Sequence, residues 1–327
     1  MLILVTNDDG IVAPGLKALV AVAARFGEVV VVAPEAERSG VSHAITLTEP
    51  LRSREIAPRW WSISGTPTDC VFVGVNHILP RRPDLVLSGK NRGPNLGGDV
   101  LYSGTVGGAM EGTIQRLPAI AFSLVSGTDD YPFDAAAAHV THVLEQAARA
   151  GIPQGVMLNV NMPSPSLAAF RGYRVTRLGT RFYSNDVISR TDPRGGSYFW
   201  IGGTRVTMEM DPETDCGAVH DGFVSITPIQ PDLMAHAALP ALAAYAKSGP
   251  RFGADRSATA ARSRKGGGTR PATRGGGQGG EPRPPPIDAP STRPGLPSRG
   301  TNQRRGLPGP PKALFHRQRG MRAKEEP

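Results

Sequence analysis

Several residue classes are scarce in this chain of 327 residues, and each scarcity argues against a class of protein. The sequence holds only two cysteines, Cys70 and Cys216, which are too few for the disulfide framework of a secreted protein of this size. No apolar run reaches the ~18 residues of a membrane-spanning helix, and no basic leader precedes the first apolar run. We therefore expect a cytoplasmic protein that does not span a membrane.

Two frequent phosphate-binding motifs are missing as well. The turn after the first apolar run lacks the Gly-x-Gly-x-x-Gly fingerprint of dinucleotide-binding proteins, and the chain has no Walker pattern Gly-x-x-x-x-Gly-Lys-Ser/Thr. A ligand bound at that turn must therefore be held in another way.

Acidic residues are scarce at one end of the chain only. From residue 251 onward there are 17 Lys and Arg against 5 Asp and Glu, whereas the first 250 residues have 20 against 23. The same stretch holds 14 of the 40 Gly and 12 of the 31 Pro. Such a composition buries too little apolar surface to fold, so we predict one folded part over 1–250 and a disordered Arg/Gly/Pro-rich tail over 251–327. Any binding of nucleic acid is expected through this tail only.

The folded part alternates short aliphatic runs with helical patterns. Continuous apolar runs without alternation are typical of strands buried on both faces of a parallel sheet. The expected strands are residues 2–6, 28–33, 84–88, 119–124 and 156–161, and the expected helices are 15–26, 71–79, a helix opening at 103–105, and 133–150. Residues 42–47 also alternate as a strand would. The order of these elements predicts an α/β fold with a mostly parallel sheet flanked by helices.

The pattern of apolar residues along the sequence changes near residue 172. Short β-type runs at 174–177, 198–201 and 222–227 are separated by Gly-, Asp- and Pro-rich stretches, and a last helix is expected over 232–247. We interpret residues 172–250 as a β-hairpin arm with a terminal helix. An arm too thin for its own core commonly packs on a second subunit.

Two adjacent carboxylates, Asp8 and Asp9, follow the first expected strand. The carboxyl ends of parallel strands border the binding crevice of an open α/β sheet. Two anions this close raise each other's pKa unless a cation lies between them, and a divalent metal with oxygen ligands can supply it. The alternative is an Asn-Asp-Asp-Gly turn without chemistry.

Two further segments fall at a strand end or a helix start. Residues 89–99 contain two asparagines and several glycines, which suits either close approach to a small charged ligand or a flexible surface loop. Ser103, Gly104 and Thr105 open a helix of small residues, as a phosphate site or as ordinary N-capping. His139 and His142 have a spacing that a metal can use, but packing histidines are favoured.

Six blocks of residues together resemble the signature blocks of the SurE family of 5′/3′-nucleotidases, in that family's order and spacing from residue 1 to about 247. The blocks are Asn7-Asp8-Asp9-Gly10, Glu37-Arg38-Ser39-Gly40, Gly65-Thr66-Pro67-Thr68-Asp69-Cys70, Ser88-Gly89-Lys90-Asn91-Arg92-Gly93-Pro94-Asn95, Tyr102-Ser103-Gly104-Thr105-Val106 and Gly222-Phe223-Val224-Ser225-Ile226-Thr227-Pro228. Lys90 departs from the family pattern, which usually has an aliphatic residue there. The tail from Arg251 lies outside the resemblance.

The resemblance implies a Rossmann-like fold and a metal-dependent phosphomonoesterase that hydrolyses nucleoside monophosphates. It also implies homodimers or homotetramers built through exchanged C-terminal elements. By motif, the ligands of one divalent metal, Mg²⁺ or Mn²⁺, are Asp8, Asp9, Ser39 and Asn91, and the phosphate faces Asn95, Ser103, Gly104 and Thr105.

Asp8 is the best candidate for the general base, with Asn95 as the second catalytic residue. Water attack and a covalent aspartyl-phosphate both remain open as mechanisms. A nucleic-acid-binding protein that acts through its basic tail is the alternative function.

Overall fold

The computed structural model describes residues 1–184, 186–202 and 206–247. The described residues up to Leu233 belong to one compact unit, and those from Met234 belong to a second. The predicted disordered tail, and with it the nucleic-acid alternative, lies outside the described residues. Among those residues, none of the helices combines the length and the apolar character needed to cross a membrane.

The elements follow one another in an alternating α/β order. The strands are β1 (Leu2–Thr6), β2 (Glu28–Pro34), β3 (Ser53–Ala57), β4 (Trp60–Ile63), β5 (Leu85–Arg92), β6 (Ala119–Val125), β7 (Met157–Pro163), β8 (Gly172–Val175), β9 (Arg181–Tyr183), β10 (Asp186–Thr191), β11 (Ser197–Gly202), β12 (Val206–Met208) and β13 (Phe223–Ile229). The helices are α1 (Pro14–Ala23), α2 (Pro67–Val73), α3 (Gly104–Ile114), α4 (Ala137–Ala150), α5 (Asp215–His220) and α6 (Leu239–Lys247), with short η segments at Gly74–Ile78, Gly97–Leu101 and His236–Ala238.

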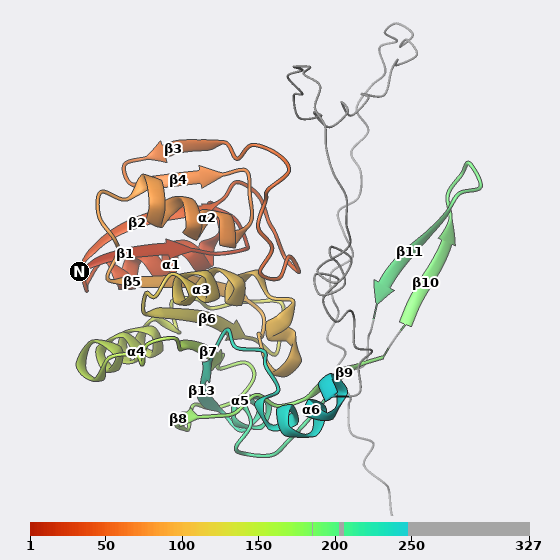
Figure 1. The fold of residues 1–327 in the computed structure, drawn as a ribbon. Helices are drawn as coiled ribbons and strands as arrows, with labels where there is room; N and C mark the ends of the chain where they lie inside the picture. Colours follow the sequence, from red (N-terminus) through yellow and green to blue (C-terminus); the bar gives the residue numbers. More distant parts are fainter. Residues whose placement is uncertain (185, 203–205, 248–327) are drawn as a thin grey trace, which may run out of the picture. The chain divides into compact units, whose positions relative to one another are not determined.

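One nine-stranded sheet organises the first unit (Figure 1). Its strand order is β3-β4-β2-β1-β5-β6-β7-β13-β8, and the strands from β4 to β7 in that order all pair in parallel. The edge strand β3 is antiparallel to β4, and β13 is antiparallel to β7. The predicted α/β fold with a mostly parallel sheet is therefore confirmed.

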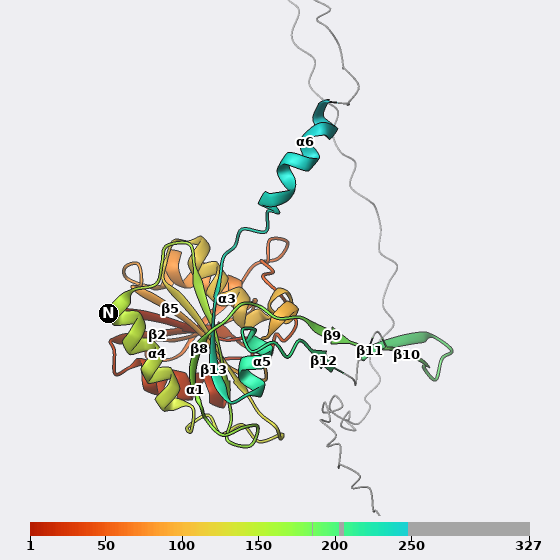
Figure 2. The same cartoon turned by 90° about the horizontal axis from the view of Figure 1, so that it is seen from below.

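Two hydrophobic cores lie on the two faces of this sheet. Figure 2 shows α1 and α4 on one side and α3 on the other. Leu16 and Leu19 of α1 pack with Ile3 and Phe122 of the sheet, whereas Val106 of α3 packs in the other core. The unbroken apolar runs in β1 and β6 follow from this arrangement, because both faces of these strands are buried.

The segment 42–47 is not a strand, contrary to the expectation from its alternation. Ser42 has a left-handed φ of 59°, and its hydroxyl donates to the carbonyl oxygen of Leu101 at 2.6 Å. The backbone N–H and the hydroxyl of Thr46 both donate to the carboxylate of Asp69. Side-chain hydrogen bonds therefore hold this segment as a loop in place of a ladder with a neighbouring strand.

Two of the three short runs expected in the arm belong to the central sheet. β8 pairs with β13, and β13 pairs with β7, so these two strands extend the core at one edge. The antiparallel pairs β9–β12 and β10–β11 form separate two-stranded sheets. Within the predicted arm, the strands β9, β10, β11 and β12 thus lie outside the central sheet. The last helix begins later than expected, at Leu239.

His139 and His142 pack against an aromatic side chain. The ring of His142 stacks on that of Tyr173 with 4.0 Å between centroids, and Nδ1 of His139 lies 3.2 Å from the hydroxyl of Tyr173. The packing interpretation of this pair is confirmed.

Candidate functional site

The predicted site residues lie where the order of the strands in the sheet reverses. From β1 the chain crosses through α1 to β2 on one side, and from β5 it crosses through α3 to β6 on the other side. β1 and β5 are paired neighbours, with Thr6 opposite Ser88. The crevice of a doubly wound sheet opens at such a switch point, at the carboxyl ends of the strands. Asp8 and Asp9 follow β1 there, and Asn91 lies at the end of β5.

Asp8 is buried beneath the start of α3. It is 4% exposed, and its Oδ1 accepts a hydrogen bond from the hydroxyl of Thr105. A Cβ atom at Gly104 would come within 2.9 Å of the Cβ atom of Asp8, so glycine is needed for this close approach. Burial raises the pKa of the Asp8 carboxyl, and hydrogen bonds from Thr105 oppose that rise. The positive end of α3 thus lies against this carboxylate.

Asp9 carries a second perturbed carboxyl. Its Oδ2 accepts from the backbone N–H of Arg92 at 3.3 Å. Burial, and then the charge of Asp8, raise its pKa from 3.8 to about 6. Glu37, which the sequence analysis did not single out as a site residue, also contributes to the rise at both aspartates. The crevice therefore has an excess of negative charge.

Ser39 lies on the loop after β2, which is the strand next to β1, at the same end of the sheet as Asp8 and Asp9. The backbone N–H of Arg38 donates to the carbonyl oxygen of Asp8 at 2.7 Å, which fixes this loop beside the aspartates. Ser39 itself is exposed, and its hydroxyl donates to Oε1 of Glu37 at 2.9 Å. Its oxygen lone pairs remain able to meet a cation.

Asn91 occupies the end of β5. Its Nδ2 donates to the carbonyl oxygen of Gly93 at 3.1 Å, a bond that leaves its side-chain oxygen unused. That oxygen is a neutral donor of the kind that hard divalent cations accept.

The chemistry of these side chains fits a magnesium-like ion. Among the residues that the structure describes, no three His, Cys, Asp or Glu side chains come together as a metal site. A cation here must therefore combine the carboxylates of Asp8 and Asp9 with neutral oxygens, which Ser39 and Asn91 can supply. Two adjacent carboxylates with raised pKa values and all-oxygen donors favour Mg²⁺ or Mn²⁺ over softer metals.

Side chains of the strands β6 and β7 fix the position of Asn95. Its backbone N–H donates to Oδ1 of Asn161 at 2.9 Å, and its carbonyl oxygen accepts from Asn159 at 2.8 Å and from Asn161 at 3.0 Å. Its own amide nitrogen donates to the hydroxyl of Ser123 at 2.7 Å. These contacts of Asn95 were not predicted from the sequence. The two asparagines inside the apolar run of β7 were the available signal.

Ser103, Gly104 and Thr105 form the N-terminus of α3, as expected. The Ser103 hydroxyl accepts from the backbone N–H of Val106 at 3.0 Å, so Ser103 is the N-cap of this helix. Because the Thr105 hydroxyl donates to Asp8, its proton is not available to another acceptor in this arrangement. The remaining donors to a bound anion are therefore backbone N–H groups of the first turn.

The loop expected after Ser88, for which ligand approach and a flexible surface loop were both open, begins as a continuation of β5. Gly89 has φ of +120°, and a Cβ atom there would lie 2.2 Å from the carbonyl oxygen of Phe122. The pairing with β6 shifts register between Gly89 and Asn91, which marks a bulge, and the Gly89–Lys90 peptide is cis.

Lys90 points away from the proposed metal ligands. The residue is completely buried, and its Nζ donates to the carbonyl oxygen of Phe133 at 2.6 Å. Burial lowers its pKa from 10.5 to about 8. Lys90, a departure from the family pattern, thus ties the end of β5 to the segment before α4.

Comparisons with known proteins agree with this geometry. A family model described as "Survival protein SurE" matches residues 3–185. The 5′-nucleotidase SurE of Citrifermentans bemidjiense is 45% identical over 245 residues, which cover 75% of this chain and 99% of that protein. The 5′/3′-nucleotidase SurE of Edwardsiella ictaluri is 48% identical over 246 residues, or 75% and 96% of the two chains. The crystal structure of the SurE protein from Aquifex aeolicus matches with a TM-score of 0.67 at 40% identity, over 75% of this chain and 100% of that one. The chain belongs to the SurE family.

Proposed function

We propose that this protein is a metal-dependent phosphomonoesterase that hydrolyses nucleoside monophosphates to nucleoside and phosphate. The observation that carries the proposal is the pair of buried Asp8 and half-buried Asp9, which lies at the switch point of the sheet with Asp8 against the N-terminus of α3. A carboxylate pair for a cation beside a helix start for an anion suits a phosphate ester and its metal. The similar proteins named as 5′-nucleotidases support the same activity.

We assign one divalent cation, Mg²⁺ or Mn²⁺, to Asp8, Asp9, Ser39 and Asn91. When bound, such a cation supplies charge neutralisation for the phosphate and acidification of a water molecule. Asp8 and Asp9 balance its charge, while Ser39 and Asn91 complete the oxygen set without adding charge.

The remaining residues bind and orient the substrate. The backbone N–H groups of Gly104 and Thr105 donate to the phosphate oxygens at the positive end of α3, of which Ser103 is the N-cap. Asn95 donates to a phosphate oxygen from a position that Asn159, Asn161 and Ser123 fix.

Asp8 serves as general base in this proposal. The Thr105 hydroxyl holds the carboxylate of Asp8 in one orientation. Asp8 takes a proton from the attacking water as the water oxygen bonds to phosphorus and the bond from phosphorus to the ester oxygen breaks, and the leaving oxygen takes up a proton from solvent to give the nucleoside hydroxyl. Attack by an aspartate in place of water would form an aspartyl-phosphate, which hydroxylamine would trap as a hydroxamate of that aspartate, whereas attack by water forms no such adduct.

Phosphate release from a panel of nucleoside monophosphates tests the function. We expect activity that a chelator removes and that added Mg²⁺ or Mn²⁺ restores. Asp9→Asn should lower kcat/KM by at least about 100-fold, because it removes a charged ligand. Glu145→Gln, an exposed change on α4, is the matched control. A folded, metal-loaded protein that releases no phosphate from any nucleotide would refute the proposal.

We further propose that the hairpin β10–β11 packs against a second copy of the chain, in a homodimer or a homotetramer. Both faces of this hairpin carry exposed apolar side chains, namely Val187, Ile188, Tyr198, Phe199, Trp200 and Ile201. An antiparallel pair with no core of its own is not stable in water unless another surface covers it.

We place the enzyme in the cytoplasm. Cys70 and Cys216 are both buried and free, as expected in a reducing compartment.

A further inference from the structure

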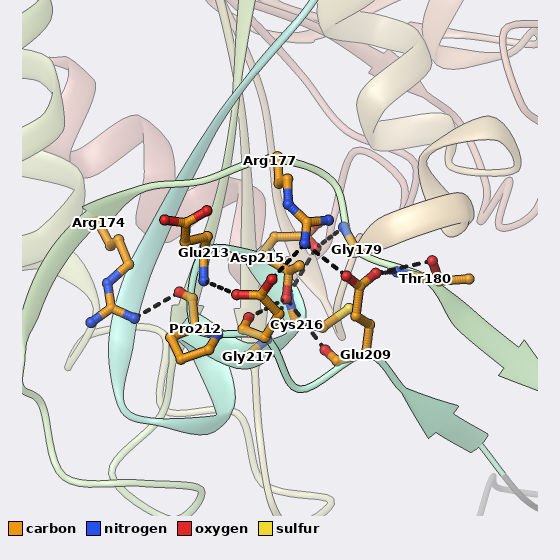
Figure 3. A network of polar contacts seen from close by, with 12 residues as sticks. Arg174, Arg177, Gly179, Thr180, Glu209, Pro212, Glu213, Asp215, Cys216 and Gly217 are labelled. Atoms are coloured by element: carbon orange, nitrogen blue, oxygen red, sulfur yellow. Dashed lines mark hydrogen bonds and ion pairs between the residues drawn. The ribbon is translucent and has the colours of Figure 1, made fainter.

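A buried carboxylate joins three segments that are distant in the sequence. Asp215, at the start of α5, is 0% exposed. Its Oδ2 accepts from the backbone N–H of Gly97 at 2.8 Å. Its Oδ1 accepts from the backbone N–H groups of Gly179 and Cys216, each at 2.8 Å. Figure 3 shows Asp215 among the residues that surround Gly179. One side chain therefore connects the segment after Asn95, the chain entering the arm, and α5.

The backbones of these segments approach one another closely. Gly97 has φ of +54°, and a Cβ atom there would lie 2.5 Å from the carbonyl oxygen of Gly179. A Cβ atom at Gly179 would in turn lie 3.2 Å from Oδ1 of Asp215. We call residues 177–183 and 206–211 the arm base. The two glycines permit close packing between the arm base and the segment after Asn95, so this contact is part of the fold.

A second carboxylate contacts the arm at β9, two residues after Gly179. Asp99 follows Gly97 in the short η segment and forms an ion pair with Arg181 of β9. Oδ2 of Asp99 also accepts from the hydroxyl of Tyr183 at 2.5 Å. The Arg181 side chain is only 6% exposed, so water weakens this pair little. The backbone carbonyl of Asp99 accepts from the N–H of Ser103, which links it to the start of α3.

The segment held in this way contains the phosphate donors proposed above. Asn95 lies two residues before Gly97, and Gly104 and Thr105 lie five and six residues after Asp99. We infer that Asp215 and Asp99 are positioning residues, through which the base of the arm holds the segment 95–105 in the geometry that binds the phosphate of the substrate. This inference rests on the proposed function for its substrate, but the contacts that carry it are independent of any activity.

The arm base also contains a network that does not reach this segment. Nη2 of Arg177 bonds to Glu209 at 2.8 Å and to Asp211 at 2.7 Å, and so joins the outgoing and returning parts of the arm (Figure 3). The Arg177 side chain is half exposed. Arg177→Gln therefore removes two ion pairs from the arm base without changing a side chain that contacts residues 95–105, and it serves as the matched control.

Hydrogen exchange of the full-length protein tests the positioning directly. Asparagine in place of Asp215 cannot accept all three N–H groups, because its amide nitrogen is a donor. We expect amide exchange over residues 95–105 to become at least about 10-fold faster in Asp215→Asn and in Asp99→Asn, since local opening becomes easier. Arg177→Gln should leave exchange in this segment unchanged. Unchanged exchange in both aspartate variants would overturn the inference.

Kinetics separate positioning from a general loss of structure. We expect the KM for AMP and the inhibition constant of inorganic phosphate to rise about 10-fold in Asp99→Asn, while the dissociation constant for Mn²⁺ stays within about 2-fold of the wild type. Tyr183→Phe, which removes one hydroxyl, provides a milder variant if Asp215→Asn does not fold. Equal losses in phosphate and Mn²⁺ binding would contradict a positioning role. A wild type without phosphatase activity would refute the proposed function, whereas the exchange experiment would still decide the inference.

Discussion

At the residue scale, the Asp8–Asp9 pair costs the folded protein stability in the absence of a cation. Both carboxyl groups have raised pKa values, with burial as the largest cause at each. The folded chain therefore binds more protons than the unfolded chain between pH 3.8 and about 6 at Asp9, and stability falls as pH rises through this window. A site built in this way sacrifices stability for binding of a divalent ion.

Asp9→Asn should therefore stabilise the chelated protein at pH 7.5. The expected gain is about 1–3 kcal/mol, because the substitution removes a half-buried charge whose repulsion with Asp8 is present above pH 6. Urea denaturation at pH 7.5 and pH 5, with chelator, measures the gain and its loss at the lower pH.

Added Mg²⁺ provides the second half of this test. It should raise the unfolding midpoint of the wild type and of Glu145→Gln, and should raise that of Asp9→Asn much less. A destabilised Asp9→Asn protein in chelator would contradict the account of the pair.

Lys90 gives an opposite dependence on pH. Its folded pKa of about 8 lies below the ordinary 10.5, so the unfolded chain binds more protons between these values and stability rises with pH. We expect the wild type to gain about 1–2 kcal/mol relative to Lys90→Met between pH 8 and pH 9.5. Urea denaturation of both proteins at the two pH values measures this difference, in which all other titrating groups cancel. Parallel pH profiles of the two proteins would show that Nζ is not desolvated.

At the element scale, the bulge at the end of β5 places Asn91 at the crevice. The strand must bend where Gly89 passes the carbonyl oxygen of Phe122, and only a residue without Cβ fits there. The same bend directs Lys90 into the core toward Phe133. The positions of a metal ligand and of a core lysine are thus set by one glycine.

Gly89→Ala should consequently damage both stability and metal binding. A Cβ atom 2.2 Å from a backbone oxygen cannot be accommodated without moving β5 or β6, and φ of +120° adds strain. We expect a loss of about 2–4 kcal/mol in the free energy of unfolding and weaker Mn²⁺ binding. Gly98→Ala is the control, because a Cβ atom there meets nothing within 4 Å. Equal behaviour of the two variants, by urea denaturation and Mn²⁺ titration, would refute this role of Gly89.

The burial of a strand decides whether its sequence could predict it. Apolar runs such as residues 2–6 predicted strands correctly because burial on both faces leaves a local signature. The strand predicted at 42–47 was wrong because Asp69, distant in the sequence, supplies the hydrogen bonds of Thr46. β3 was missed because an exposed edge strand has no apolar pattern to detect. β4 was missed because its four residues are too few to show a periodic pattern.

The candidate site divides in the same way. Asp8, Asp9 and Asn91 could be placed from the sequence because each follows a recognisable strand, and strand ends of a parallel sheet converge. The partners of Asn95, and the link from Asp215 to Gly97, depend on contacts across 66 and 118 residues. Such contacts follow from the strand order, which local periodicity does not specify.

At the scale of the whole molecule, one element is left without a partner surface. The hairpin β10–β11 is exposed along both strands in the described chain, with Ile201 95% exposed. Large apolar side chains in this arrangement normally indicate an interface. A second copy is the partner we propose, because a closed dimer covers two such hairpins at once.

The double substitution Trp200→Asp with Ile201→Asp should therefore yield monomers. The two side chains point to opposite faces of β11, so the variant places a charge on each face whichever one is covered. Burying either charge without a partner is costly, and loss of an aromatic anchor alone weakens an interface by about 2 kcal/mol or more, or about 30-fold in the dissociation constant. Sedimentation equilibrium of the wild type and the variant measures this change. Ile56→Asp on the exposed edge strand β3 is the matched control, because it introduces the same charge on an apolar strand residue outside the arm. A wild type that is monomeric at micromolar concentration, or a double variant with unchanged mass, would show that the hairpin is covered in some other way.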